Sequence, residues 1–115
     1  MIVHTAQLFR IKDPDLLDIT VKAGAKPFAP TWEMVWAIKR GTMTREDYEY
    51  LYTGILKMSA DLYPRAWQDL LARPRVVLAC YCPPGAFCHR LLLAEHLIKN
   101  FGAMKGGEIL WQASA

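Results

Sequence analysis

The sequence lacks the features that would place a protein in a membrane or in an oxidising compartment. No apolar run reaches the length of a membrane-spanning helix. The opening residues MIVHTAQLF have neither the basic start nor the long apolar core of a signal peptide. We therefore expect a cytoplasmic protein with no membrane partner, in which the three cysteines are reduced thiols rather than a disulfide framework.

The sequence also has too little positive charge in any one place to favour duplex nucleic acid as a partner. The net charge is +3, the pI is about 8.8, and the basic residues are scattered. Proteins that bind a duplex usually gather lysine and arginine in a dense stripe. The mild positive excess permits a small anionic ligand instead. Whether the chain forms a homo-oligomer is left open.

Internal repeats and low-complexity segments are absent, and residues 1–115 are enough for one domain around a single core. Alternating apolar and polar residues predict strands over 2–9 and around 18–21. The apolar run RVVLACYC at 75–82 predicts a strand that is buried on both faces. A final strand is predicted over 106–111.

Helices are predicted between these strands from their end signals. Thr31 and Thr44 are typical N-caps, Gly41 ends the first helix, Pro64 opens a third, and a last helix covers 87–102. The predicted buried faces are Trp32, Val35 and Trp36 on the first helix, and Tyr48, Leu51, Tyr52, Ile55 and Leu62 on the second. This order of elements predicts an α/β fold, a three-layer sandwich with a small, mostly parallel sheet.

The most unusual stretch is CYCPPGAFCHR, residues 80–90, in which three cysteines, a histidine and an arginine surround a Pro-Pro-Gly turn. In open parallel sheets, ligands bind beyond the carboxyl ends of the strands, where the next helix presents unpaired N–H groups. A cation in the first turn opposes the helix dipole, so Arg90 favours a bound anion there. The alternative is that Arg90 points to solvent or pairs with a carboxylate such as Glu95.

The cysteines allow two further interpretations. A zinc site needs four ligands, but Cys80 and Cys82 share one side of a strand, and Cys88 and His89 on a helix would diverge by about 100°. We therefore expect no metal and no cofactor. The other interpretation is a catalytic thiol, with Cys82 or Cys88 as nucleophile and His89 as base. The phosphatase pattern of Cys, five residues and Arg is not met.

The segment LACYCPPGAFCHRLLLAEHL resembles the domain-of-unknown-function family 488, in which a strand ends in cysteine and Cys-His-Arg opens a helix. The run DITVKAGAKPFAPTWEMVWAIKRGTMTREDYEYLY is similar to the middle of that family. The resemblance implies a small Rossmann-like α/β domain, common in bacteria and their phages. It also implies that Cys88, His89 and Arg90 form the signature of a pocket.

At the end of the strand the sequence departs from this family. The resemblance implies that Cys80 or Cys82 takes the strand-end position, where the family often has an acidic residue just after its cysteine. Here Tyr81 and Cys82 follow instead. This difference argues against catalysis by a carboxylate.

From these features we predict a module that binds a small anionic, nucleotide-like molecule where strand 75–82 meets helix 87–101. The predicted ligand-binding residues are Arg90, His89, Cys88, Cys82 and Gly85, assisted by Lys22 and Arg10, with Phe28 or Trp32 covering a base. No Walker motif or clear acid/base pair is present, so capture without chemistry is expected, as in a phage protein that sequesters a nucleotide signal. The alternative is a small enzyme that acts on nucleotides or nucleosides through a cysteine nucleophile.

Overall fold

The computed structural model describes residues 1–111, and within them it has one sheet of four parallel strands. The strands are β1 (Ile2–Gln7), β2 (Leu16–Asp18), β3 (Arg75–Cys80) and β4 (Met104–Ile109). The helices are α1 (Trp32–Arg40), α2 (Arg45–Leu62), α3 (Pro64–Leu71) and α4 (His89–Phe101), with a short 3₁₀ turn, η1 (Lys26–Phe28). The strand order is β2-β3-β1-β4. The predicted α/β fold with a parallel sheet is confirmed.

The ends of the helices follow the local signals in the sequence. Thr31 and Thr44 each accept a hydrogen bond from the backbone N–H three residues further on, at 3.2 and 3.1 Å. Gly41 and Gly102 follow α1 and α4 with φ of 73° and 70°, in the left-handed region that glycine adopts without steric cost. Capping is a local interaction, and these predictions are confirmed.

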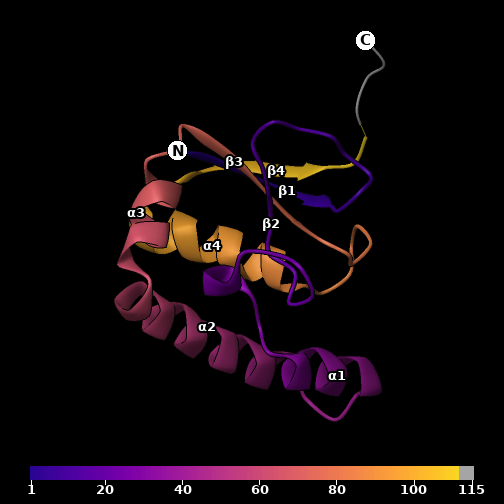
Figure 1. Ribbon diagram of the computed structural model, residues 1–115. Coiled ribbons are helices and arrows are strands. Elements are labelled where there is room, and N and C mark those ends of the chain that lie inside the picture. The colour runs from indigo at the N-terminus through magenta and orange to yellow at the C-terminus, as the bar shows by residue number, and fades with distance from the viewer. Residues whose placement is uncertain (112–115) are drawn as a thin grey trace.

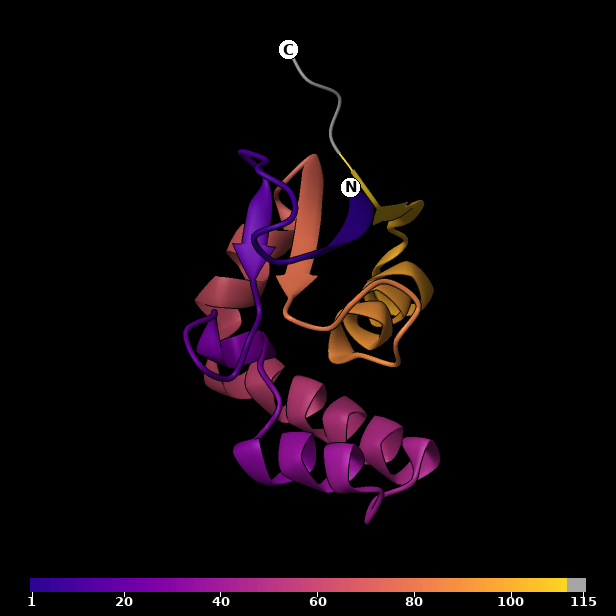
Figure 2. The ribbon, with the colours of Figure 1, turned by 90° about the vertical axis from the view of Figure 1, so that its right-hand side faces the viewer.

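The helices all lie on the same side of the sheet (Figures 1 and 2). Val3, Val76 and Leu78 point from the sheet into the main core among the helices. Val77 points to the opposite face, where it packs in a smaller cluster with Ile11. Ile11 belongs to the connection between β1 and β2, which passes over that face (Figure 1). The layer on this second face is therefore a loop rather than a helix.

The second strand is shorter than predicted and ends at Asp18. The Asp18 carboxylate accepts a hydrogen bond from the Thr20 N–H at 2.8 Å, and the Gly24 N–H donates to the Thr20 carbonyl at 2.9 Å. An aspartate side chain that bonds the backbone two residues on competes with a sheet ladder. The chain therefore turns where the sequence pattern predicted a strand up to residue 21.

The predicted buried faces of two helices are partly wrong. On α1, Met34 is buried, whereas Trp32 and Trp36 are about half exposed and stack on each other with ring centroids 6.0 Å apart. On α2, Leu51 and Leu62 are exposed. The buried residues of α2 are Tyr48, Tyr52, Leu56 and Ser59. Indole rings can bury one face against each other while the other stays in water, so apolar spacing alone misassigned them.

No helix within residues 1–111 is long and apolar enough to cross a membrane.

Candidate functional site

The predicted site lies where β3 ends and the chain returns to begin α4. Residues 76–80 of β3 are buried, so the strand end is fixed in the core. The chain then turns through residues 81–88, seen in orange in Figure 2. Gly85 has a φ of 85°, and a Cβ at this position would meet no atom within 4 Å. Gly85 is therefore required for the shape of the turn, and close packing does not explain it.

Three sulfur atoms gather at this turn. The Sγ atoms of Cys80, Cys82 and Cys88 all lie within 4.8 Å of one another. Cys80 and Cys88 are buried, with 2% and 3% of their surface exposed, whereas Cys82 is partly exposed. Cys82 is therefore the thiol that a substrate or reagent can reach, with two buried sulfurs behind it.

The sequence predicted three separate reduced thiols, but two of the three sulfur atoms are in contact. The sulfur atoms of Cys80 and Cys88 are in disulfide contact, and Cys82 is the free thiol. However, the Cα atoms of the pair are 7.9 Å apart, and disulfides usually need about 4.4–6.8 Å. A relaxed disulfide would require the backbone to move, whereas a pair of reduced sulfurs requires only a small separation of the two side chains.

The argument that Cys88 and His89 must diverge is wrong. Cys88 is the N-cap of α4 and has extended backbone angles, φ −155° and ψ 150°, so the helical spacing does not apply to it. As a result, Cys88 Sγ lies 3.6 Å from His89 Nδ1. The geometric reason for excluding a metal site is removed by this arrangement.

The His89 ring is held in one orientation and one tautomer. Its Nε2 lies 2.7 Å from the Ile19 carbonyl oxygen, and because a carbonyl only accepts, Nε2 carries the proton. Burial, reinforced by the charge of Arg90, lowers the pKa of His89 to about 4. His89 is therefore neutral at pH 7, with the Nδ1 lone pair facing the Cys88 sulfur.

Arg90 is completely buried, and protein acceptors use every N–H group of its guanidinium. Nε and Nη2 donate to the Glu108 carboxylate at 3.2 and 2.8 Å. Nη1 donates to Cys80 Sγ at 3.0 Å and to the Cys82 carbonyl at 2.7 Å, while Nη2 also donates to the Pro83 carbonyl at 3.4 Å. An arginine has five such donors, so this conformation leaves none for the anion that the sequence suggested.

Two residues near the three cysteines were not predicted from the sequence. Glu108 on β4 pairs with Arg90 and also accepts a hydrogen bond from the Thr5 hydroxyl. Burial, together with the charge of nearby Cys82, raises the pKa of Tyr48 on α2. A single acid in the apolar segment GGEILW was a weak signal for Glu108, and nothing local in the sequence pointed to Tyr48.

The remaining predicted ligand-binding residues are dispersed. Phe28 is buried in the core against Trp67, and Trp32 stacks on its own helix. Arg10 donates from Nε to the Leu110 carbonyl at 2.8 Å. Exposed Lys22 lies in the turn after β2, three residues beyond the carbonyl that His89 contacts. The segment that leads to Lys22 contacts the start of α4 through the Ile19 carbonyl.

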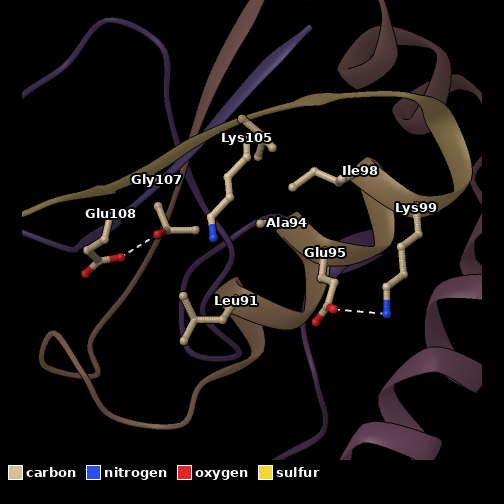
Figure 3. Close-up of a pocket in the computed structure, with 10 residues that line it drawn as sticks. Leu91, Ala94, Glu95, Ile98, Lys99, Lys105, Gly107 and Glu108 are labelled. Carbon is tan, nitrogen blue, oxygen red and sulfur yellow. Dashed lines mark hydrogen bonds and ion pairs between the residues drawn. The ribbon is translucent and has the colours of Figure 1, made fainter.

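A groove of about 530 Å³ runs beside the site between α4 and β4 (Figure 3). Leu91, Ala94 and Ile98 form its apolar helix side, and Lys105 reaches over it from β4. Glu108 lines this groove as well as binding Arg90. The groove is therefore linked to the three cysteines by one buried ion pair.

Comparison with known proteins adds one finding. The family model described as the active DUF488-N3 subclade matches residues 15–101, which is more than half of the chain. No curated protein and no solved structure matches. The match includes the three cysteines, His89 and Arg90, whereas Glu108 lies beyond it. The chain belongs to the DUF488 family, and within it to the active DUF488-N3 subclade.

Proposed function

We propose that this protein is a thiol-dependent enzyme that acts on a small anionic, nucleotide-like substrate, with Cys82 as the nucleophile. The observation that supports this most directly is the gathering of three sulfurs within 4.8 Å, of which Cys82 alone is partly exposed. The groups expected to recognise a ligand are dispersed by comparison, so catalysis becomes the leading hypothesis over capture. The description of the subclade as active agrees with this order.

Hydrogen-bond donors and the start of a helix lie next to the three cysteines. A thiolate is stabilised by nearby cations and by the start of a helix, where backbone N–H groups are unpaired. The Arg90 guanidinium donates to Cys80 Sγ at 3.0 Å and to the Cys82 carbonyl at 2.7 Å. Helix α4 begins next to the cluster without an acidic residue in its first turn and without a side-chain cap. These donors are available to a negative charge that develops on sulfur or on the substrate during the reaction.

The proposed reaction has two displacement steps. The Cys82 thiolate forms a bond to an electrophilic atom of the substrate, and the leaving group departs with the electron pair of the broken bond. Water then cleaves the bond between Cys82 and the substrate, adding its hydroxyl to the substrate and returning its proton to the sulfur. The anionic character of the substrate is inferred from the net charge of +3, from exposed Lys22, and from the start of α4, which has no side-chain cap and no acidic residue in its first turn.

Capture of the same class of molecule without turnover is the second candidate. The observation that favours it is the small supply of acid/base groups around Cys82. His89 has its pKa lowered to about 4 by burial and is therefore a weak base, and Glu108 is paired with Arg90. A site with a reachable thiol and few proton carriers would hold a ligand more readily than it would convert one.

The two candidates are separated by following the ligand. Reduced, metal-free protein is incubated with mononucleotides, dinucleotides, cyclic nucleotides and ADP-ribose derivatives, then denatured, and the supernatant is analysed by mass spectrometry. We expect one compound to be converted beyond one equivalent, and Cys82→Ser to lower that rate by at least about a hundredfold. Tyr81→Phe is the matched control, because Tyr81 neighbours Cys82 but its ring packs on Phe9.

The other outcomes are equally informative. A compound that is depleted and then recovered unchanged supports capture and contradicts the enzyme. Turnover that survives Cys82→Ser excludes Cys82 as the nucleophile. If no compound is depleted or converted, the anionic nucleotide-like class is wrong for both candidates.

A further inference from the structure

We propose that Cys80, Cys82, Cys88 and His89 form a binding site for a single Zn²⁺ ion. Three thiolates and one neutral imidazole are a ligand set that zinc commonly takes in proteins. This inference goes beyond the proposed function, because the same sulfurs would then have two alternative states. One state holds metal, and the other leaves Cys82 free to react.

The three sulfurs lie close enough together to share one tetrahedral zinc ion, with His89 next to one of them. With Zn–S bonds of about 2.3 Å and Zn–N bonds of about 2.0–2.1 Å, tetrahedral angles place sulfurs about 3.8 Å apart and sulfur from nitrogen about 3.5 Å. The three Sγ atoms lie within 4.8 Å of one another, and Cys88 Sγ is 3.6 Å from His89 Nδ1. Two adjustments are needed: the Cys80 and Cys88 sulfurs, which are in contact, must move apart, and His89 Nδ1, which lies outside the group of three sulfurs, must approach the other two.

The His89 ring is already arranged as a metal ligand is. A histidine that binds zinc through one nitrogen almost always donates its other N–H to a carbonyl or carboxylate, which fixes the ring. His89 donates from Nε2 to the Ile19 carbonyl at 2.7 Å, so the Nδ1 lone pair is the one directed at Cys88. The edge of Tyr52, at a ring centroid distance of 5.6 Å, restricts the ring further.

The charges around the cluster also suit a zinc ion held by three thiolates. Such a unit carries one net negative charge, which is costly to bury without compensation. The N–H···S contact from Arg90 to Cys80 supplies a donor to a coordinating sulfur, the kind of outer contact that tunes a metal site. Cys80 and Cys88 are buried, whereas partial exposure of Cys82 leaves one side through which an ion can enter.

Zinc binding and thiol chemistry would exclude each other. A thiolate that coordinates zinc has its reactive electron pair engaged with the metal, so Cys82 cannot attack a substrate until the ion leaves. This consequence rests on the proposed function, whereas the metal site itself does not. The metal-loaded chain would be the protected form of the thiols, and the metal-free chain the reactive form.

The test uses the full chain kept under a phosphine reductant and stripped of metal with a chelator. ZnCl₂ alone or CoCl₂ alone is added, and unbound metal is removed by gel filtration. We expect one zinc ion per chain by elemental analysis, and with Co²⁺ the thiolate charge-transfer absorption and visible bands of a tetrahedral site. Zn²⁺ should also slow iodoacetamide labelling of all three cysteines.

Three variants test the assignment of the ligands. Cys82→Ser should weaken Zn²⁺ binding by at least about tenfold, the loss that even outer contacts cause when removed. His89→Gln should change the cobalt spectrum. His96→Ala is the matched control, because His96 is on the same helix but packs on Trp67, and it should leave Zn²⁺ affinity unchanged. Circular dichroism confirms that each variant is folded.

The site is overturned if reduced, folded protein retains no zinc, or if Cys82→Ser binds Zn²⁺ as tightly as the unaltered chain. An unchanged cobalt spectrum in His89→Gln removes His89 from the ligand set and contradicts the four-ligand site. If zinc binds but the metal-free chain neither depletes nor converts any nucleotide, the proposed function fails alone. If turnover is found and zinc does not bind, the metal site fails alone.

Discussion

Strand β3 has an arginine network at each end, and the two networks differ in burial. At its start, Arg75 donates to Asp13 at 2.8 and 2.9 Å and to Asp15 at 3.0 Å, yet 33% of its side chain is exposed. Beyond its end, Arg90 is 1% exposed and bonds Glu108, two carbonyls and a sulfur. An arginine therefore bonds neighbouring segments at each end of β3. Arg75 at the start is partly exposed to water, whereas Arg90 beyond the end is buried in the core.

The difference shows which end of the sheet tolerates change. Removing an exposed ion pair returns its partners to water, at a cost of about 1 kcal/mol or less. Removing one partner of a buried ion pair leaves a buried charge unpaired and several acceptors without hydrogen bonds, which costs more stability. The sulfur cluster lies at the buried end, so its geometry and the stability of the fold depend on the same guanidinium. Arg75 can be altered without that consequence.

The largest effect is expected from Arg90→Met. The change removes the Arg90 donors to the Glu108 carboxylate and the Cys82 carbonyl, and we expect the free energy of unfolding to fall by about 3 kcal/mol. This is the low end for a buried pair, because 20% of the Glu108 side chain is exposed. Urea denaturation of reduced, metal-free protein measures it. Arg65→Met, at an exposed pair with Asp69, is the control and should change little.

A loss below about 1 kcal/mol in Arg90→Met would remove the contrast between the two ends of β3. It would also return Arg90 to the role suggested by the sequence, that of a residue free to hold an anion.

A smaller effect is expected from Arg75→Ala. We expect a loss of about 1 kcal/mol, because the pair is bidentate but partly exposed. Salt screens exposed charges, so raising the ionic strength from about 0.01 M to about 1 M should shrink the difference between this variant and the unaltered chain. The measurement is urea denaturation at both salt concentrations. A difference that does not depend on salt would show that packing of the arginine stem matters more than its charge.

The smallest effect is the dependence of the Arg75 network on pH. The hydrogen bond from Arg75, above all, lowers the pKa of Asp13 below its usual value of 3.8. A depressed carboxyl pKa contributes stability that is fully present above the unfolded value and is lost as the pH falls through the folded value. The gap in stability between the unaltered chain and Asp13→Asn should therefore be constant near about pH 6 and close towards about pH 2. A gap that widens on acidification contradicts the assignment.

Local features of the sequence predicted most of the fold. Thr31, Thr44 and Gly102 determine helix ends through contacts within a few residues, and these positions were confirmed. The short β2 could not be predicted, because the Asp18 side chain competes with the strand through a bond that alternating hydrophobicity does not reveal.

The sequence predicted a site at the turn after β3, which stays a prediction, and it did not reveal the contacts made there. The closely spaced cysteines directed the prediction to this turn, whereas the approach of Cys88 to the other sulfurs depends on its extended backbone just before the helix. The role of Arg90 depends on Glu108, which is near it only because β4 joins the sheet beside β1. Because strand order, and not nearby sequence, brings Glu108 to Arg90, the sequence around Arg90 gave no sign of this partner. The positive charge in the first turn of the helix was therefore interpreted as a site for an anionic ligand.

The strand order β2-β3-β1-β4 has a consequence for how the chain reaches this state. β1 lies inside the sheet, yet Ile2 pairs with Arg75 and with Met104, so neither neighbour of β1 is close to it in sequence. Closing such long loops precedes any gain from pairing, which slows folding. Glu108 arrives with the same step that docks β4, and until then the Arg90 charge has no carboxylate. The hydrogen bonds from Arg90 that border the three cysteines therefore gain their carboxylate partner only when β4 is paired with β1.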